Sequence, residues 1–484
     1  MGLLGILLGL FLMIALAYRG WSILLLAPVA ALVAAAFAAE PLLAHWTQTF
    51  MTSAAGFFAQ FFPLFLLGAL FGKLMDDSGS VATIADFMTE KLGAERAILA
   101  VVLAGALVTY GGVSLFVAFF VLAPMAVALF RAANVPRRLM PAAIALGTST
   151  FTMSALPGTP SIQNAIPMPF FGTTPFAAPG LGIIASVIML GFGMWWLKRA
   201  EERAKRAGEG FGDDPPKIDA TPADDLLVRE RGTVAREFDP AELSRGQPSP
   251  TRPPIALAML PLGIVIAVNL AMSQFILPSL DVSFLAEERW GETTLAGVGG
   301  VWSVVTALVA AIVAVIAINH RRLPALRDTM DAGANASVLP AVSVASLVGF
   351  GAVVAALPAF VAVRDALLAM EGGPLVSLAV ATNVLAALTG SASGGMTIAL
   401  DALGEIYKTM ALDAGIDPSL MHRVAVISSG TLDSLPHNGA VVTLLAVCGA
   451  SHRESYFDIV MVAIVGALIA LVAVIGIGSV AGAF

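Results

Sequence analysis

Asp433 and His437 are spaced four residues apart, on either side of Leu435-Pro436, in a stretch that is otherwise largely apolar. An ionisable side chain inside a membrane is costly, so it is by default a candidate for a proton relay or a ligand contact. Burial favours the neutral form of a carboxyl group, which suits a group that takes up and releases protons. We therefore predict that Asp433 and His437 are proton-coupling residues. The alternatives are that Asp433 caps the helix after the proline and that His437 only holds the bend.

Four short polar segments accompany this pair, and all are rich in Gly, Ser, Thr, Asn and Gln. They are residues 111–114, 154–164, 389–395 and 431–438. None contains Lys or Arg, so we expect hydroxyls, amides and backbone N–H groups to hold a bound carboxylate. The alternative is that the hydroxyls only join packed membrane helices. The predicted substrate-binding residues are Gly111, Gly112, Ser114, Thr159, Ser161, Gln163, Asn164, Thr389, Gly390, Ser391, Ser393, Thr431, His437 and Asn438.

A second class of chemistry, serine hydrolysis inside the membrane, would use a serine at position 391, 393, 428 or 429 with His437 as its base. Residues 390–394 read Gly-Ser-Ala-Ser-Gly, which is not the Gly-x-Ser-Gly spacing of membrane proteases. A hydrolase with one centre also has no use for polar breaks in both halves of the chain. We therefore expect that the protein is not an enzyme.

The elements that must position these segments are membrane helices. Of the 484 residues, 58% are hydrophobic and 12% are charged, and the mean hydropathy is +0.89. This composition excludes an ordinary water-soluble enzyme. The basic residues form no stripe, so we expect no nucleic-acid partner. Cys448 is the single cysteine, and no Cys and His spacing predicts a metal or cofactor site.

Twelve apolar runs approach or exceed the length of about 20 residues that crosses a bilayer. They are residues 3–18, 21–39, 56–74, 97–131, 139–170, 179–197, 254–277, 294–318, 334–360, 375–400, 419–449 and 457–480. The first run is expected to be a retained helix, since a second apolar run follows it almost directly.

Two runs in each half are unusual. Residues 97–131 are too long for one span and contain Gly111-Gly112, so they predict a re-entrant hairpin, and residues 375–400 open a second one. Proline removes a backbone donor and interrupts a helix. Pro157 in residues 139–170 and Pro436 in residues 419–449 therefore predict two broken helices.

The basic residues support the first hairpin, because Lys and Arg prefer the cytoplasmic side of membrane spans. If Arg19 is placed on the cytoplasmic side, Lys73 falls on the same side. Arg131 and Arg137 are then also cytoplasmic only if residues 97–131 form a hairpin. Each half then has about five spans and one hairpin. Because that number of spans is odd, the second half must be inverted relative to the first.

The two halves also resemble each other in sequence. Leu156-Pro157 matches Leu435-Pro436, and Gly111 matches Gly390 at the same offset. The chain is thus predicted to be an all-α polytopic membrane protein with two inverted repeats, residues 1–197 and 254–484. The proline-rich and charged residues 198–253 predict a flexible linker. Inverted repeats with interrupted helices are typical of secondary transporters.

At residues 157–164 and 428–439 the sequence resembles the gluconate permease (GntP-type) family of proton:organic-acid symporters, within the ion transporter superfamily. The resemblance extends over essentially the whole chain. It implies an importer of small hydroxylated carboxylates in a bacterial inner membrane, driven by protons and often a homodimer. The first break is less rich in proline and histidine than in typical gluconate carriers. The second is similar to the branch thought to carry 3-hydroxybutyrate, so a short hydroxy acid is the expected substrate.

The expected partners are therefore a small carboxylate, a proton and the lipid bilayer. A Na⁺-coupled carboxylate transporter is the alternative, because related families hold Na⁺ with oxygens at hairpin tips, which residues 389–393 would supply. The predicted orientation places the linker in the cytoplasm and both termini in the periplasm.

Overall fold

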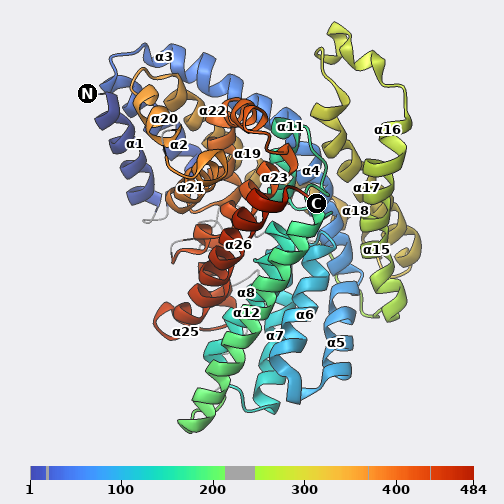
Figure 1. Ribbon diagram of the computed structural model, residues 1–484. Coiled ribbons are helices and arrows are strands. Elements are labelled where there is room, and N and C mark those ends of the chain that lie inside the picture. The colour runs from blue at the N-terminus through green and yellow to red at the C-terminus, as the bar shows by residue number, and fades with distance from the viewer. Residues whose placement is uncertain (1, 18–20, 213–245, 369, 437) are drawn as a thin grey trace.

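The protein is a bundle of membrane helices (Figure 1). The computed structural model describes residues 2–17, 21–212, 246–368, 370–436 and 438–484, and no strand occurs in these ranges. Seven of the described helices are long and apolar enough to cross a membrane, which confirms the predicted polytopic all-α membrane protein. They are Leu42–Asp77, Leu115–Ala132, Pro179–Arg206, Ile255–Ser279, Leu295–Asn319, Leu326–Ala356 and His452–Ala481.

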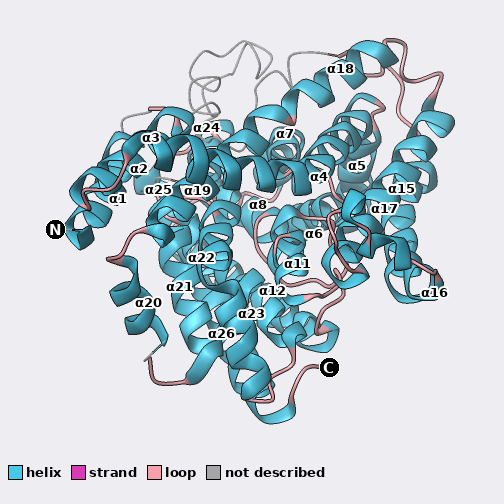
Figure 2. Cartoon of the chain, turned by 90° about the horizontal axis from the view of Figure 1, so that it is seen from above, coloured by secondary structure: helices cyan, strands magenta, loops and turns pink. Residues whose placement is uncertain are grey.

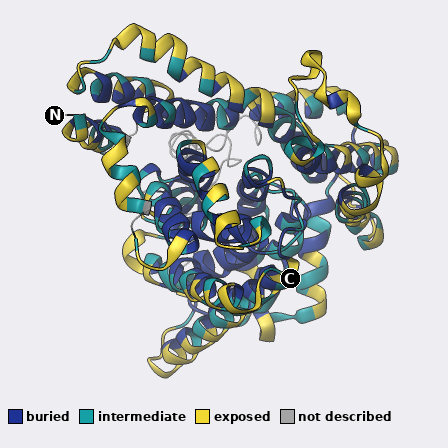
Figure 3. Ribbon diagram, turned by 45° about the horizontal axis from the view of Figure 1, so that its top comes forward, coloured by how far each residue is buried: buried dark blue, intermediate teal, exposed yellow. Residues whose placement is uncertain are grey.

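Figure 3 shows exposed residues mainly along the outer helices and buried residues toward the centre. The exposed residues include many large apolar ones, and the buried residues are largely small or apolar. Phe11, Leu43 and Val472 are exposed, whereas Ala30, Ala143 and Val474 are fully buried. Lipid tails accommodate an apolar exterior that water would not. The pattern agrees with a chain surrounded by a bilayer.

The chain forms two helical hairpins at the predicted positions. In the first, α6 (Ala97–Tyr110) and α7 (Leu115–Ala132) pack against each other, and in the second α21 (Gly373–Thr389) packs against α22 (Ala392–Asp413). The tips need glycine, because Gly112 has φ +100° and Gly390 has φ +64°. A residue with a Cβ rarely adopts such backbone angles.

Two further helices are broken where the prolines predicted it. The first consists of α8 (Met140–Thr148) and α9 (Phe151–Ser154), followed by irregular residues 155–161 and the short helices α10 (Ile162–Ala165) and α11 (Pro167–Phe171). In the second, α23 (Pro418–Ser429) is followed by a short 3₁₀ turn, Leu432–Ser434, and then by α24 (Gly439–Val447).

The remaining helices surround these hairpins and breaks. Some extend beyond the predicted runs: the run at residues 56–74 lies within a longer helix, and the one at residues 179–197 continues to Arg206, into the predicted linker. Residues 213–245 of that linker lie outside the described ranges. The surrounding helices are α1 (Gly2–Ala17), α2 (Ile23–Phe37), α3 (Leu42–Ala44), α4 (Met51–Asp77), α12 (Pro179–Arg206), α15 (Ile255–Ala271), α16 (Leu277–Ser279), α17 (Leu295–Asn319), α19 (Val338–Ala356), α25 (His452–Ile459) and α26 (Gly466–Ala481).

Three helices had no counterpart among the predicted apolar runs. They are α5 (Ser80–Leu92), α18 (Leu326–Ala336) and α20 (Phe360–Leu368). The first two carry several polar and charged side chains, and α5 is bent by 104° from the segment Ala94–Tyr110 that follows it. A search for long apolar runs does not find helices of mixed polarity.

Packing brings the hairpin tips and the breaks together in the middle of the molecule. α6 packs on α8, α7 on α24, α21 on α23, and α22 on both α10 and α11. In Figure 2, α8 and α11 lie near the centre of the view, with α22 on one side and α6 on the other. The fold thus concentrates the four polar segments at one place.

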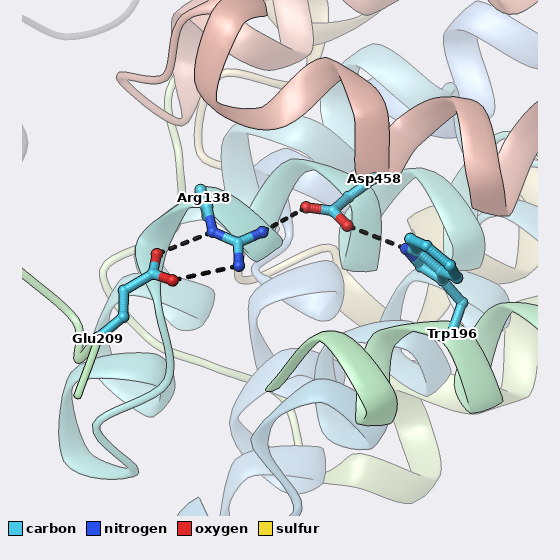
Figure 4. A network of polar contacts seen from close by, with 4 residues as sticks. All are labelled: Arg138, Trp196, Glu209 and Asp458. Carbon is cyan, nitrogen blue, oxygen red and sulfur yellow. Dashed lines mark hydrogen bonds and ion pairs between the residues drawn. The ribbon is translucent and has the colours of Figure 1, made fainter. Parts of the chain in front are cut away.

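Arg138, in the turn before α8, links three parts of the chain (Figure 4). Its guanidinium donates to both carboxylate oxygens of Glu209, at 2.8 and 3.2 Å, and to Asp458 on α25 at 2.7 Å. The indole N–H of Trp196 on α12 donates to the other oxygen of Asp458 at 2.9 Å. The hydrogen bond with Glu209 raises the pKa of Arg138, so its charge is permanent. The network fixes α8, α12 and α25 to one another.

We expect Arg138→Gln and Asp458→Asn each to lower the free energy of unfolding, and the two losses not to add, because both variants break one network. A double-mutant cycle on protein purified in detergent should give a coupling free energy of about 0.5–3 kcal/mol. Arg321→Gln, which alters an exposed arginine with no ion pair in the described part of the chain, is the control. Strictly additive losses would contradict the network.

Candidate functional site

Two adjacent cavities lie where the hairpin tips meet the helix breaks. The larger cavity, of about 160 Å³, lies between these tips on one side and α4, α18 and α19 on the other. The smaller cavity, of about 40 Å³, lies among α7, α8, the second break and α24. Leu115, Met153 and Gln163 line both cavities and so form the wall between them.

The larger cavity has a polar side and an apolar side. Five predicted substrate-binding residues lie on the polar side: Gly112, Ser114, Ser161, Gln163 and Ser393. The side formed by α4, α18 and α19 is mainly apolar, with Leu64, Phe65, Pro340 and Val344, and Ser337 is a polar residue on it. Its described lining contains no charged side chain.

Two long helices begin at the larger cavity. Ser114 caps α7 by accepting a hydrogen bond from the backbone N–H of Phe116, at 3.3 Å. Ser391 caps α22 by accepting one from Gly394, at 3.2 Å, and Ser393 in the first turn lines the cavity. The N-terminus of a helix carries roughly half a positive charge and presents N–H donors that bind anions. The cavity is therefore uncharged but suited to a carboxylate.

Asp433 lines the smaller cavity together with Ser434 and Asn438. The Ser434 hydroxyl donates to an oxygen of Asp433 at 3.2 Å. Asn438 caps α24, since its Oδ1 accepts from the backbone N–H of Ala440 at 2.7 Å, and its amide donates to the carbonyl of Gly390 at 2.8 Å. The second break is thereby tied to the tip of the second hairpin. His437, the predicted partner of Asp433, lies outside the described residues.

The other predicted binding residues shape the backbone and line neither cavity. The hydroxyl of Thr389 donates to the carbonyl of Leu385 at 2.8 Å, and that of Thr431 to the carbonyl of Ser428 at 2.8 Å. Gly111 lies against Leu262 of α15, which leaves no room for a Cβ. This group consists of Gly111, Thr159, Asn164, Thr389, Gly390, Ser391 and Thr431.

Asn164 is the centre of a buried network that supports the first break. Its amide donates to the carbonyls of Thr159 and Pro175, both at 3.0 Å, and its Oδ1 interacts with His422 at 3.2 Å. Asn164 is 0% exposed, and these bonds use both of its donors. Asn164 lines neither cavity, and its hydrogen bonds support the loop at the first break.

Arg423, next to His422 on α23, is fully buried against this break. Its guanidinium donates to the carbonyl of Ala155 at 3.1 Å and to the carbonyl of Ala177 at 2.6 and 3.2 Å. Among the described residues, its hydrogen-bond partners are oxygens of neutral groups, and none of them is a carboxylate. Helix α23 thus places a positive charge behind the first break.

The sequence interpretation missed His422 and Arg423. It looked for basic residues in the binding site only within the four polar segments, and both residues lie outside these, in the apolar run at residues 419–449. The two ionisable side chains inside this apolar run are the sequence signal that could have identified them as functional or structural residues. Tyr110, whose hydroxyl donates to the carbonyl of Pro157 at 2.8 Å, and Asn269, whose amide donates to that of Gly158 at 3.0 Å, support the same loop. Among the described residues, no three His, Cys, Asp or Glu side chains gather as metal ligands.

We expect Arg423→Gln to lower the yield and the melting temperature of the protein, because the carbonyls of Ala155 and Ala177 lose a charged donor in a buried place. The melting temperature of Arg423→Lys should lie between those of the wild type and Arg423→Gln, since a single ammonium group cannot make all the hydrogen bonds of a guanidinium. The readout is thermal melting in detergent. Arg453→Gln, at an exposed position of α25, is the control. A melting temperature for Arg423→Gln equal to that of the control would refute this structural role.

Comparison with known sequences finds a family of permeases and a relative named as a transporter. Residues 1–173 match the profile of the GntP family permeases. The uncharacterized transporter YxjC of Bacillus subtilis (strain 168) is 41% identical over 491 residues, and the match covers 100% of both chains.

Two solved structures have a similar fold. The YdaH transporter of Alcanivorax borkumensis, described as having an unusual topology, superposes with a TM-score of 0.52 at 17% identity, over 90% of this chain and 89% of that one. MtrF of Neisseria gonorrhoeae, from a class of antimetabolite efflux pumps, gives a TM-score of 0.52 at 15% identity, over 90% and 85% of the two chains. At such identities the likeness concerns the fold alone.

Proposed function

Because the chain belongs to the GntP permease family of membrane transporters, we propose that it imports a small hydroxylated carboxylate by proton symport. The observation that carries the proposal is the larger cavity, whose described lining is uncharged although two long helices begin at it. Helix N-termini attract an anion without forming a permanent ion pair. That balance suits a site that must also release its substrate.

The size and the lining of the larger cavity favour a short hydroxy acid such as 3-hydroxybutyrate. Its volume of about 160 Å³ lies below the roughly 300–1,000 Å³ of pockets for drug-sized ligands. A polyhydroxylated acid such as gluconate would place hydroxyls against Leu64, Phe65 and Val344, where they would find no partners. A short acid places its alkyl end there instead.

Asp433 is the proposed proton carrier. The alternative function of capping α24 is filled by Asn438, which supports this assignment. The smaller cavity holds about 40 Å³, and a water molecule needs at least about 10–15 Å³, so water has room to reach the carboxyl group. Protonation of Asp433 and binding of the carboxylate neutralise each other. We propose that only the empty or the doubly loaded carrier changes conformation, since moving an unpaired charge through hydrocarbon is costly.

Na⁺ coupling is supported less well. The oxygens at residues 389–393 were its expected ligands, but of these residues only Ser393 lines the larger cavity, and the Thr389 hydroxyl donates to Leu385. Both coupling ions are therefore compared directly in the transport experiment.

We expect proteoliposomes with an acidic exterior to accumulate labelled 3-hydroxybutyrate without Na⁺, and excess gluconate to compete poorly. Asp433→Asn should abolish accumulation against the gradient, because a neutral amide cannot exchange a proton. Asp413→Asn, at the exposed end of α22, is the matched control. A requirement for Na⁺, or accumulation by Asp433→Asn at the rate of the control, would reject proton coupling through this residue.

We also propose that residues 1–197 and 254–484 are inverted repeats. In each, a hairpin is followed by a broken helix and then by long apolar helical structure, which is α12 in the first and α25 with α26 in the second. Inversion places residues 198–253 in the cytoplasm and both termini in the periplasm of a bacterial inner membrane. The homodimer that the family resemblance implies stays a prediction.

Single-cysteine labelling tests this orientation, because Cys448 is the only cysteine and Cys448→Ser removes it. We expect an impermeant maleimide to label Glu288→Cys, between α16 and α17, in intact cells. Gln247→Cys, near the end of the linker, should react only after permeabilisation. Both positions are exposed, so a lack of labelling reports sidedness. The reverse pattern would invert the proposed topology.

A further inference from the structure

Gln163 differs from the other polar residues of the site because it faces both cavities and keeps unused hydrogen-bonding capacity. It lines the larger and the smaller cavity and is only 7% exposed. Its Oε1 atom is buried and has no hydrogen-bond partner among the described residues. Buried polar atoms without partners are rare in native structures, and each needs an explanation.

The residues on either side of Gln163 hold it in place. Ser161 caps α10 by accepting from the backbone N–H of Asn164, and its hydroxyl donates to the carbonyl of Met153 at 2.8 Å. Asn164 is fixed by the network around His422 and Arg423. The backbone at Gln163 is therefore held firmly, and the side-chain amide is the part that is left to respond to a ligand.

The side-chain amide of Gln163, beside the larger cavity, carries both donors and an acceptor. Rotation about the terminal torsion of glutamine is broad, so either the oxygen or the nitrogen turns toward a ligand at little cost. An amide matches an aliphatic hydroxyl, which also donates one hydrogen bond and accepts others. It matches a carboxylate less well, because its oxygen repels the anion.

We propose that Gln163 is the specificity-determining residue that binds the hydroxyl group of the substrate. This inference rests on the proposed function. The N-termini of α7 and α22 hold the carboxylate, Gln163 bonds the hydroxyl, and the alkyl end lies against Leu64 and Phe65 of α4. An acid without the hydroxyl leaves the Gln163 amide unpaired in a buried place, so the site discriminates against it.

The experiment compares 3-hydroxybutyrate with butyrate as competing substrates in proteoliposomes. The wild-type protein should prefer the hydroxy acid by at least about 10-fold, because sites that bond a hydroxyl reject analogues that lack it. Gln163→Leu should bring the ratio close to one, through slower uptake of the hydroxy acid and little change for butyrate. Gln48→Leu, at an exposed glutamine that lines neither cavity, is the matched control and should keep the ratio of the wild type.

The outcomes separate this inference from the proposed function. A wild-type protein that moves neither acid, nor any other short hydroxy acid, rejects the proposed function itself. A wild-type preference that survives in Gln163→Leu overturns the assignment of Gln163 alone. If Gln163→Leu is not monodisperse in detergent, Gln163→Met keeps the length of the side chain without its amide, and the same ratio is read from stabilisation of the purified protein by each acid. Equal stabilisation ratios in Gln163→Met and the wild type would likewise overturn the assignment.

Discussion

The backbone at the two helix breaks must find hydrogen-bond partners in surroundings that supply little water, and much of the structure follows from how it does so. Asparagine meets the need repeatedly, because one amide both donates and accepts. Asn438 caps α24 and reaches the second hairpin, Asn164 joins Thr159 to Pro175, and Asn269 reaches Gly158. Arg423 adds a charged donor to the carbonyls of Ala155 and Ala177. The first break is thus held by Asn164, Asn269 and Arg423, which line neither cavity.

This arrangement explains why the larger cavity is uncharged. The groups that stabilise the breaks lie behind its wall, so its polar side keeps hydroxyls, an amide and helix N-termini for a ligand. Interaction with a helix end contributes about 0.3–1 kcal/mol at exposed sites and up to about 2 kcal/mol in partly buried ones. Several such contributions hold an anion firmly enough for recognition and weakly enough for release. A buried arginine inside the cavity would bind the same anion with less freedom to let it go.

The sequence predicted the breaks and hairpins well, because proline and glycine act locally on the backbone. Pro157, Pro436, Gly112 and Gly390 lie at or beside the interruptions that the structure contains. Helices α5 and α18 were not predicted, since they contain too many polar residues to be recognised as apolar runs.

The sequence could not show which hydroxyls face the cavity. Ser114 and Ser393 line it, whereas Thr389 and Thr431 bond to their own backbone. Both groups carry hydroxyls in the same kind of polar segment, and the packing of distant helices decides which of them line the cavity. The same holds for Arg423, whose position beside the first break depends on contacts across 268 residues of chain.

The donors at the first break have a consequence for how the chain is made. Residues 155–177 are synthesised long before Asn269, His422 and Arg423, which complete their hydrogen bonds. Until Arg423 has been synthesised, the carbonyls of Ala155 and Ala177 lack these hydrogen bonds. Domains are otherwise expected to fold in the order of synthesis. The first break therefore depends on the second half of the chain for these hydrogen bonds. The lining of the larger cavity likewise includes Val344 and Ser393, so it is complete only after much of the last third of the chain has been made.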